Sequence, residues 1–139
     1  MIALLQAEVL LEIPFHDVDS MGIVWHGHYL KYFEIARTAL MRRAGMDVTE
    51  MQASGCVWPV VTCEVKYIRP LRYGQKVRVE ARLEDHDCRL KISYTIRDLE
   101  GQERYTRATT TQFPVDARSG EARYETPAEL VAAIQRAMA

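Results

Sequence analysis

The sequence is poor in cysteine. Only Cys56, Cys63 and Cys88 occur among its 139 residues, and no two of them have the C-x-x-C spacing. An odd number of cysteines without paired spacing argues against a disulfide framework and against a structural zinc site. We therefore expect reduced thiols that serve as small apolar residues of strands in a cytoplasmic protein.

Signals for secretion, for membranes and for nucleic acids are also missing. The first eight residues contain no basic segment, and their apolar run is too short for a signal peptide. No stretch approaches the roughly 20 apolar residues of a membrane span. The formal net charge is −1, so no basic field marks a nucleic-acid-binding protein. We expect a cytoplasmic protein with no membrane span and no nucleic-acid partner.

The composition is that of a globular protein, with 48% hydrophobic and 27% charged residues. The length suits one domain over residues 1–139, and we find no internal repeat or low-complexity tract. Alternating apolar residues predict a first strand near residues 7–16. Apolar residues at helical spacing predict a long helix over residues 28–44, which Gly45 would end.

The second half of the chain has the period-two alternation of strands. A β-rich run covers residues 57–68, and alternating segments come after it near residues 76–83, 89–97 and 103–113. A closing helix is predicted over residues 127–138, with Thr126 as its N-cap. This order predicts an α+β fold in which an antiparallel sheet of about five strands wraps around one long helix. A dimer that extends so small a sheet is expected.

The residues that carry chemistry gather between the first strand and the long helix, in the stretch FHDVDSMGIVWHGHY (residues 15–29). Asp17 and Asp19 stand two residues apart, and Gly22 and Gly27 permit close approach of the backbone to a ligand. The first turn of a helix carries free N–H groups and a partial positive charge, which stabilise an oxyanion. A carboxylate beside such donors has the parts for acyl transfer, but spacing alone does not choose between the two aspartates, and either has an ordinary interpretation as an N-cap.

A family resemblance rests on this stretch and on a second one downstream. Residues 15–37, FHDVDSMGIVWHGHYLKYFEIAR, are similar to the signature [FY]-x-D-x-D-x-x-G-[IV]-[VI]-[WY]-H-x-x-Y followed by F-E-x-A-R. Residues 63–74, CEVKYIRPLRYG, resemble the family's strand and turn before D-x-V-x-V-E, which is QKVRVE (residues 75–80) in this chain. Over residues ~8–115 the chain therefore resembles the hotdog-fold acyl-CoA thioesterases of the 4-hydroxybenzoyl-CoA thioesterase-like family. The branch of small bacterial thioesterases associated with the Tol-Pal system belongs to that family.

The resemblance implies a hotdog fold, a homo-oligomer (dimer or tetramer) and a site at the dimer interface. It implies that Asp19, the second Asp of D-x-D, is the catalytic carboxylate, as a nucleophile or as a general base for water. It implies that the backbone N–H of His26 points at the thioester carbonyl, and that Asp17 organises the loop. The substrate would be an acyl thioester of CoA or of an acyl carrier protein, and no cofactor or metal is needed.

Further contacts to the substrate are expected on both subunits. The acyl pocket is expected between residues 23–25 of one subunit and the stretch 58–60 of its partner. The expected substrate-binding residues are Gly22, Ile23, Trp25, Gly27, Tyr29, Trp58 and Val60. Cations for the nucleotide of CoA or for the phosphopantetheine are expected among Arg72, Arg89, Lys91 and Arg123. Residues 85–89, DHDCR, are less basic than the family's corresponding run, which keeps an acyl-carrier-protein substrate open.

Three alternative interpretations fit the sequence less well. A hotdog hydratase or dehydratase acting on 3-hydroxyacyl thioesters uses a catalytic histidine in a different motif, and the D-x-D-x-x-G pattern argues against it. A non-catalytic thioester-binding or scaffold protein would be suggested by a neutral residue in place of Asp19, and Asp19 is present. A zinc site at His16, His26 and His28 lacks a standard ligand spacing.

Overall fold

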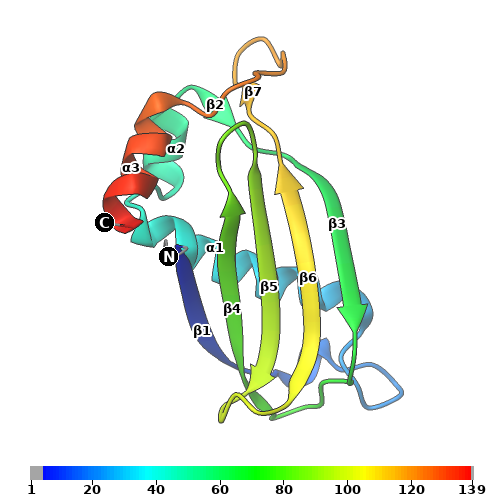
Figure 1. Ribbon diagram of the computed structural model, residues 1–139. Helices are drawn as coiled ribbons and strands as arrows, with labels where there is room; N and C mark the ends of the chain where they lie inside the picture. The colour runs from blue at the N-terminus through cyan, green and yellow to red at the C-terminus, as the bar shows by residue number, and fades with distance from the viewer. Residues whose placement is uncertain (1–4, 139) are drawn as a thin grey trace.

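The computed structural model describes residues 5–138, and its largest element is an antiparallel sheet (Figure 1). Five strands pair in the order β1-β4-β5-β6-β3, as the alternating segments predicted. Their bounds are β1 (Gln6–Glu12), β3 (Val60–Tyr67), β4 (Lys76–Asp85), β5 (Leu90–Asp98) and β6 (Arg104–Gln112). The inward residues of β4 and β5 are almost completely buried, and they form the centre of the core.

The long helix α1 (Tyr29–Arg43) lies across one face of this sheet and packs against β1 and β4. Its end confirms the predicted stop. Gly45 has a φ of +73°, its N–H donates to the carbonyl of Arg42, and the N–H of Met46 donates to that of Met41. This pattern is a Schellman motif, which satisfies the last carbonyls of the helix. Leu30 and Ile35 are exposed, so this single chain does not enclose the helix on every side.

Smaller elements join the ends of the sheet to the helices. The short helix α2 (Val48–Ala53) comes directly after α1, and α3 (Ala128–Met138) closes the chain. Strand β2 (Cys56–Val57) pairs with β7 (Val115–Asp116) in a second, two-stranded sheet. The predicted β run over residues 57–68 is therefore two separate strands.

Three further expectations need correction. The first strand ends at Glu12 rather than near residue 16, because Pro14 has no N–H to donate and residues 15–17 form a 3₁₀ turn. Thr126 does not cap α3, which begins at Ala128. Its hydroxyl donates instead to the carbonyl of His86 at 2.6 Å, so it anchors the approach to α3 against the β4–β5 turn. Cys88 is exposed in that turn and is not a strand residue.

The two edge strands of the sheet differ in character. On the β1 edge, Glu8 forms an ion pair with Arg78 of the neighbouring strand at 2.7 Å. Strand β3, which pairs with β6 alone, has exposed residues along nearly its whole length. Val61 and Tyr67 are among the exposed apolar side chains there. An uncovered apolar edge of this kind is a surface for pairing with another strand.

Candidate active site

The loop that carries the two aspartates is a tight hairpin. Val18 and Val24 form a β-bridge, and the N–H of Asp19 donates to the carbonyl of Ile23 at 2.9 Å. The turn needs a glycine at its end, because Gly22 has a φ of +79°. The Asp19 carboxylate accepts a hydrogen bond from the N–H of Met21 through Oδ1, at 2.9 Å. Asp19 is half-buried, and within residues 5–138 its Oδ2 accepts no hydrogen bond.

Asp17 is in a very different environment. Its side chain is 2% exposed. Oδ1 accepts from the Lys31 ammonium at 2.7 Å, and Oδ2 accepts from the Tyr32 hydroxyl at 2.6 Å. Both partners belong to the first turns of α1, so Asp17 fastens the loop to the helix. Its backbone carbonyl also accepts from the N–H of Trp25, which holds the second strand of the hairpin in place.

These contacts shift the pKa values of Asp17 and Tyr32. Burial by itself raises the pKa of Asp17, but the hydrogen bonds from Lys31 and Tyr32 outweigh burial and lower that pKa below its usual value. The pKa of Tyr32 is raised, first by burial and then by the hydrogen bond to the Asp17 carboxylate. Asp17 is therefore an ionised group whose two oxygens are already engaged.

The mouth of α1 supplies free backbone donors. Residues 26–28 form a 3₁₀ turn that runs directly into α1. The N–H of His28 donates to the carbonyl of Trp25 at 2.9 Å, whereas the N–H groups of His26 and Gly27 have no acceptor within the described part of the chain. The carbonyl of His26 accepts from the Tyr67 hydroxyl at 2.8 Å, which ties this turn to the end of β3. Unpaired N–H groups at the positive end of a helix are the kind of donor that can stabilise an oxyanion.

Trp25 covers this turn. A Cβ added to Gly27 would lie 2.2 Å from the nearest atom of the Trp25 ring, so any side chain at this position requires the indole to move. The ring stands 5.0 Å from that of His26 and 5.3 Å from that of His28, between ring centroids. Trp25 remains 48% exposed and presents an apolar surface beside the free N–H groups.

The other residues expected to contact the substrate lie in two places. Ile23 is half-buried in the hairpin, and Tyr29 is buried, with its hydroxyl accepting from the N–H of Leu71 at 3.4 Å. Trp58 and Val60 lie at the far end of β3. Val60 and Tyr67 are seven residues apart, which is ~23 Å along a strand. Within one subunit, Trp58 and Val60 therefore do not share a pocket with Trp25.

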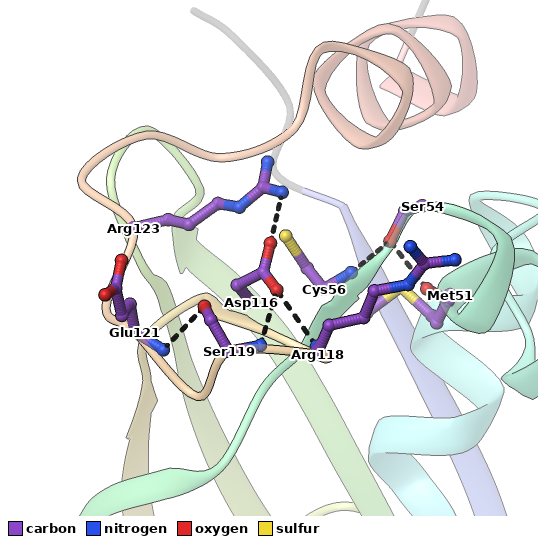
Figure 2. A network of polar contacts seen from close by, with 8 residues as sticks. All are labelled: Met51, Ser54, Cys56, Asp116, Arg118, Ser119, Glu121 and Arg123. Carbon is purple, nitrogen blue, oxygen red and sulfur yellow. Dashed lines mark hydrogen bonds and ion pairs between the residues drawn. The ribbon is translucent and has the colours of Figure 1, made fainter.

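The four expected cations do not form one cluster. Arg72 lies in the loop before β4, next to Leu71, whose carbonyl accepts from the N–H of Val24 in the hairpin. Arg89 and Lys91 belong to the β4–β5 hairpin, where Arg89 forms an ion pair with Asp85 at 3.1 Å. Figure 2 shows Arg123 reaching Asp116, 2.9 Å away. Arg89 and Arg123 are thus engaged in ion pairs at the end of the sheet far from the aspartate-bearing hairpin of residues 18–24.

No group of three histidine, cysteine, aspartate or glutamate side chains converges on a metal position among residues 5–138. His16 and His28 both approach Asp17 Oδ1, at 3.7 and 3.8 Å, but Lys31 already supplies a cation at that oxygen. Lys31, Tyr32 and Tyr67 are site residues that sequence reasoning missed. Each makes a contact more than ten positions away in the chain, and no local spacing signals such a contact.

Comparison with known proteins identifies the family. The model of the Thioesterase-like superfamily matches residues 13–136. The chain belongs to the thioesterase-like superfamily. The Bacillus subtilis protein named "Putative acyl-CoA thioesterase YneP" is 34% identical over 78% of this chain and 79% of its own. The Arabidopsis thaliana "Acyl-acyl carrier protein thioesterase ATL3, chloroplastic" is 28% identical over 69% of this chain and 51% of its own.

Solved structures of the superfamily share the fold. A DHNA-CoA thioesterase from Staphylococcus aureus superposes with a TM-score of 0.78 at 25% identity, covering 86% of this chain and 80% of its own. The architecture of one helix on a five-stranded antiparallel sheet is therefore the hotdog thioesterase fold, as the sequence motifs implied. None of the helices within residues 5–138 has the length and apolar character needed to cross a bilayer.

Proposed function

We propose that this protein hydrolyses acyl thioesters of CoA or of an acyl carrier protein, with Asp19 as the reacting carboxylate. Membership of the thioesterase-like superfamily supports the reaction class. The difference between the two aspartates supports the choice of residue. Asp17 has both oxygens engaged and is buried, whereas Asp19 keeps Oδ2 without a partner in the described structure and is partly open to solvent. That difference is the observation on which the assignment depends.

The proposed chemistry uses the carboxylate and the helix mouth together. As a general base, Asp19 takes a proton from water, and the hydroxide adds to the thioester carbonyl. The oxyanion is held by the N–H groups of His26 and Gly27, the C–S bond breaks, and the thiolate takes up the proton. As a nucleophile, Asp19 attacks the carbonyl itself, the thiolate leaves, and water hydrolyses the resulting anhydride. One oxyanion donor contributes ~10²–10³-fold to such a reaction.

We further propose that the site is completed by a second copy of the chain. Two-fold pairing of β3 with the β3 strand of a partner would run antiparallel and extend the sheet at its uncovered edge. The Tyr67 end of one subunit would then lie beside the Val60 end of the other. This arrangement brings the partner's Trp58 and Val60 to Trp25, which the ~23 Å separation along β3 prevents within one subunit.

The acyl group would enter a groove on that partner. A groove of about 300 Å³ lies between α1, α2 and β2. Its apolar lining contains three methionines, Met41, Met46 and Met51, together with Val48, Val57 and Trp58. Methionine side chains adapt to flexible ligands, so this lining suits an aliphatic chain better than a rigid ring.

The test is a thioester-release assay on the purified protein. Acyl-CoA substrates from short to long chain are compared with aromatic acyl-CoA and with the same acyl groups on a carrier protein. Release of free thiol from at least one of these series is the expected result. A 3-hydroxyacyl-CoA included in the series separates hydrolysis from dehydration, because dehydration releases no thiol. Dehydration without thiol release, or binding without turnover, would contradict the proposal.

A further inference from the structure

The outer face of the sheet, which is the face turned away from α1, brings together positive charges that a stable sheet normally separates. Lys66 on β3 pairs directly with Arg107 on β6. Arg97 on β5 pairs with Arg104 on β6, beyond a shift of register. Directly opposite residues of an antiparallel pair have Cβ atoms only ~5 Å apart, and like charges at that separation destabilise the pair. Such a local conflict is expected where a bound group compensates for it.

None of these four cations has an acidic partner in the described structure. Among the ion pairs of residues 5–138, none involves Lys66, Arg97, Arg104 or Arg107. Arg82 on the same face contacts Glu80 at 3.6 Å. Lys76 and Lys91 also form no ion pair within residues 5–138, so what distinguishes Lys66, Arg104 and Arg107 is that they gather around one hollow.

The three cations line a hollow of about 500 Å³. Its other polar side chains are Glu64, Ser93, Thr95 and Thr109. A concavity of this size is typical of small-ligand sites. Guanidinium and ammonium groups with hydroxyls beside them are the donors that phosphate oxygens prefer. Glu64 is the one acidic residue that lines the hollow, and Glu84 reaches its rim, where it accepts a hydrogen bond from the Ser93 hydroxyl at 2.6 Å. The two carboxylates lower the affinity for an anion without cancelling three positive charges.

The hollow lies near the Tyr67 end of β3, on the opposite face of that strand from the candidate active site. Lys66 directly precedes Tyr67, and the Tyr67 hydroxyl meets the His26 carbonyl on the opposite side of β3. We infer that Lys66, Arg104 and Arg107 bind the phosphorylated nucleotide end of a CoA thioester. They would replace the cations expected at residues 85–89, where two aspartates stand. The naming of CoA depends on the proposed thioesterase function, but binding of a phosphorylated nucleotide does not.

Nucleotide binding is measured first, without any reaction. Adenosine 3′,5′-bisphosphate, which is the phosphorylated part of CoA without the pantetheine arm, is titrated into the protein by calorimetry. Arg107→Gln is expected to weaken its binding about tenfold or more. The matched control Arg82→Gln removes the same charge from the same face and is expected to bind like the wild type. No binding by the wild type, or equal loss in both variants, would overturn the inference.

Two companion measurements exclude a purely structural role. Glu64→Gln removes the one acidic residue that lines the hollow and is expected to tighten nucleotide binding several-fold, whereas weaker binding would contradict a phosphate site. Arg107→Gln also relieves the contact with Lys66, so its melting temperature is expected to equal or exceed that of the wild type. A lower melting temperature together with unchanged affinity would show that Arg107 only supports the fold.

Turnover assays distinguish a site for the CoA nucleotide from a docking surface for an acyl carrier protein. Arg107→Gln is expected to raise KM for an acyl-CoA about tenfold with little change in kcat. The same acyl group on pantetheine, which lacks the nucleotide, is expected to react equally well with both proteins. If the variant instead impairs only acyl-carrier-protein turnover, the patch docks a protein and the inference is wrong. If no thioester is hydrolysed at all, the proposed function fails while the calorimetric result still decides the nucleotide site.

Discussion

The Tyr32 hydroxyl donates a 2.6 Å hydrogen bond to the buried carboxylate of Asp17 and so joins the candidate catalytic hairpin to α1. This contact, with the Lys31 ammonium on the other oxygen, fixes where the hairpin meets the helix mouth. It also separates the roles of two aspartates that stand only two residues apart. Asp17 fastens the hairpin to the helix through both oxygens, whereas Asp19 keeps one oxygen without a hydrogen bond in the described structure.

Removal of the Tyr32 hydroxyl is expected to lower stability. In Tyr32→Phe a buried, ionised carboxylate loses one of its two partners, which typically costs ~1–3 kcal/mol in the free energy of unfolding. Urea unfolding followed by circular dichroism measures the loss. Tyr73→Phe is the matched control, because the Tyr73 side chain is exposed. Equal stability of the two variants would show that the buried contact contributes nothing.

The lowered pKa of Asp17 predicts a pH dependence of stability. An unfolded aspartate has a pKa of ~3.9, and the folded value is lower. The ionised Asp17 therefore stabilises the folded state fully above about pH 5, and this contribution is lost as the pH falls below the unfolded pKa and through the folded pKa. The difference in unfolding free energy between wild type and Asp17→Asn should shrink between about pH 5 and the lowest pH at which both still fold. A constant difference over that range would contradict the assignment.

Gly27→Ala tests the packing at the helix mouth. The new Cβ cannot fit beneath Trp25 unless the indole moves, and the indole forms the apolar wall beside the free N–H groups. We expect kcat/KM to fall at least about tenfold while the fold is kept. The double variant Gly27→Ala, Trp25→Ala relieves the clash, so its loss should be smaller than the sum of the two single losses. Additive losses would show that the two residues act independently.

The proposed dimer is tested on the exposed edge of the sheet. In a two-fold interface each substitution occurs twice, so Val61→Lys places two like charges at the proposed β3 contact. We expect this variant to be monomeric by analytical ultracentrifugation and to lose activity while keeping its secondary structure. Leu10→Lys, at an exposed position on the opposite edge strand β1, is expected to leave the assembly unchanged. Dissociation by the β1 variant alone would place the interface elsewhere.

The repetitive elements of the fold were predictable from the sequence. Apolar periodicity located α1 and the long strands, because one buried face recurs at every second residue of a strand and at helical spacing in α1. The sequence did not reveal α2, β2 or β7. A helix of six residues and strands of two residues are too short for any period to show. Their positions depend on tertiary packing instead.

The site was predictable in composition but not in geometry. The D-x-D pattern located the loop, and the family motif selected Asp19, which stays a prediction. The partners of Asp17 lie 14 and 15 residues away, and the Tyr67 hydroxyl lies 41 residues from His26. Contacts of this kind depend on how the loop docks on the helix, which local sequence does not encode. The hollow at Lys66 and Arg107 likewise depends on strand register.

The central claim is that Asp19 is the reacting carboxylate. The most direct measurement compares Asp19→Asn with Asp17→Asn in a thioester-release assay, with urea unfolding of both variants. We predict that Asp19→Asn keeps wild-type stability and lowers kcat at least a hundredfold, about 2.7 kcal/mol at the barrier. Asp17→Asn is predicted to lose stability and to retain much more of kcat. Full activity in Asp19→Asn would contradict the account.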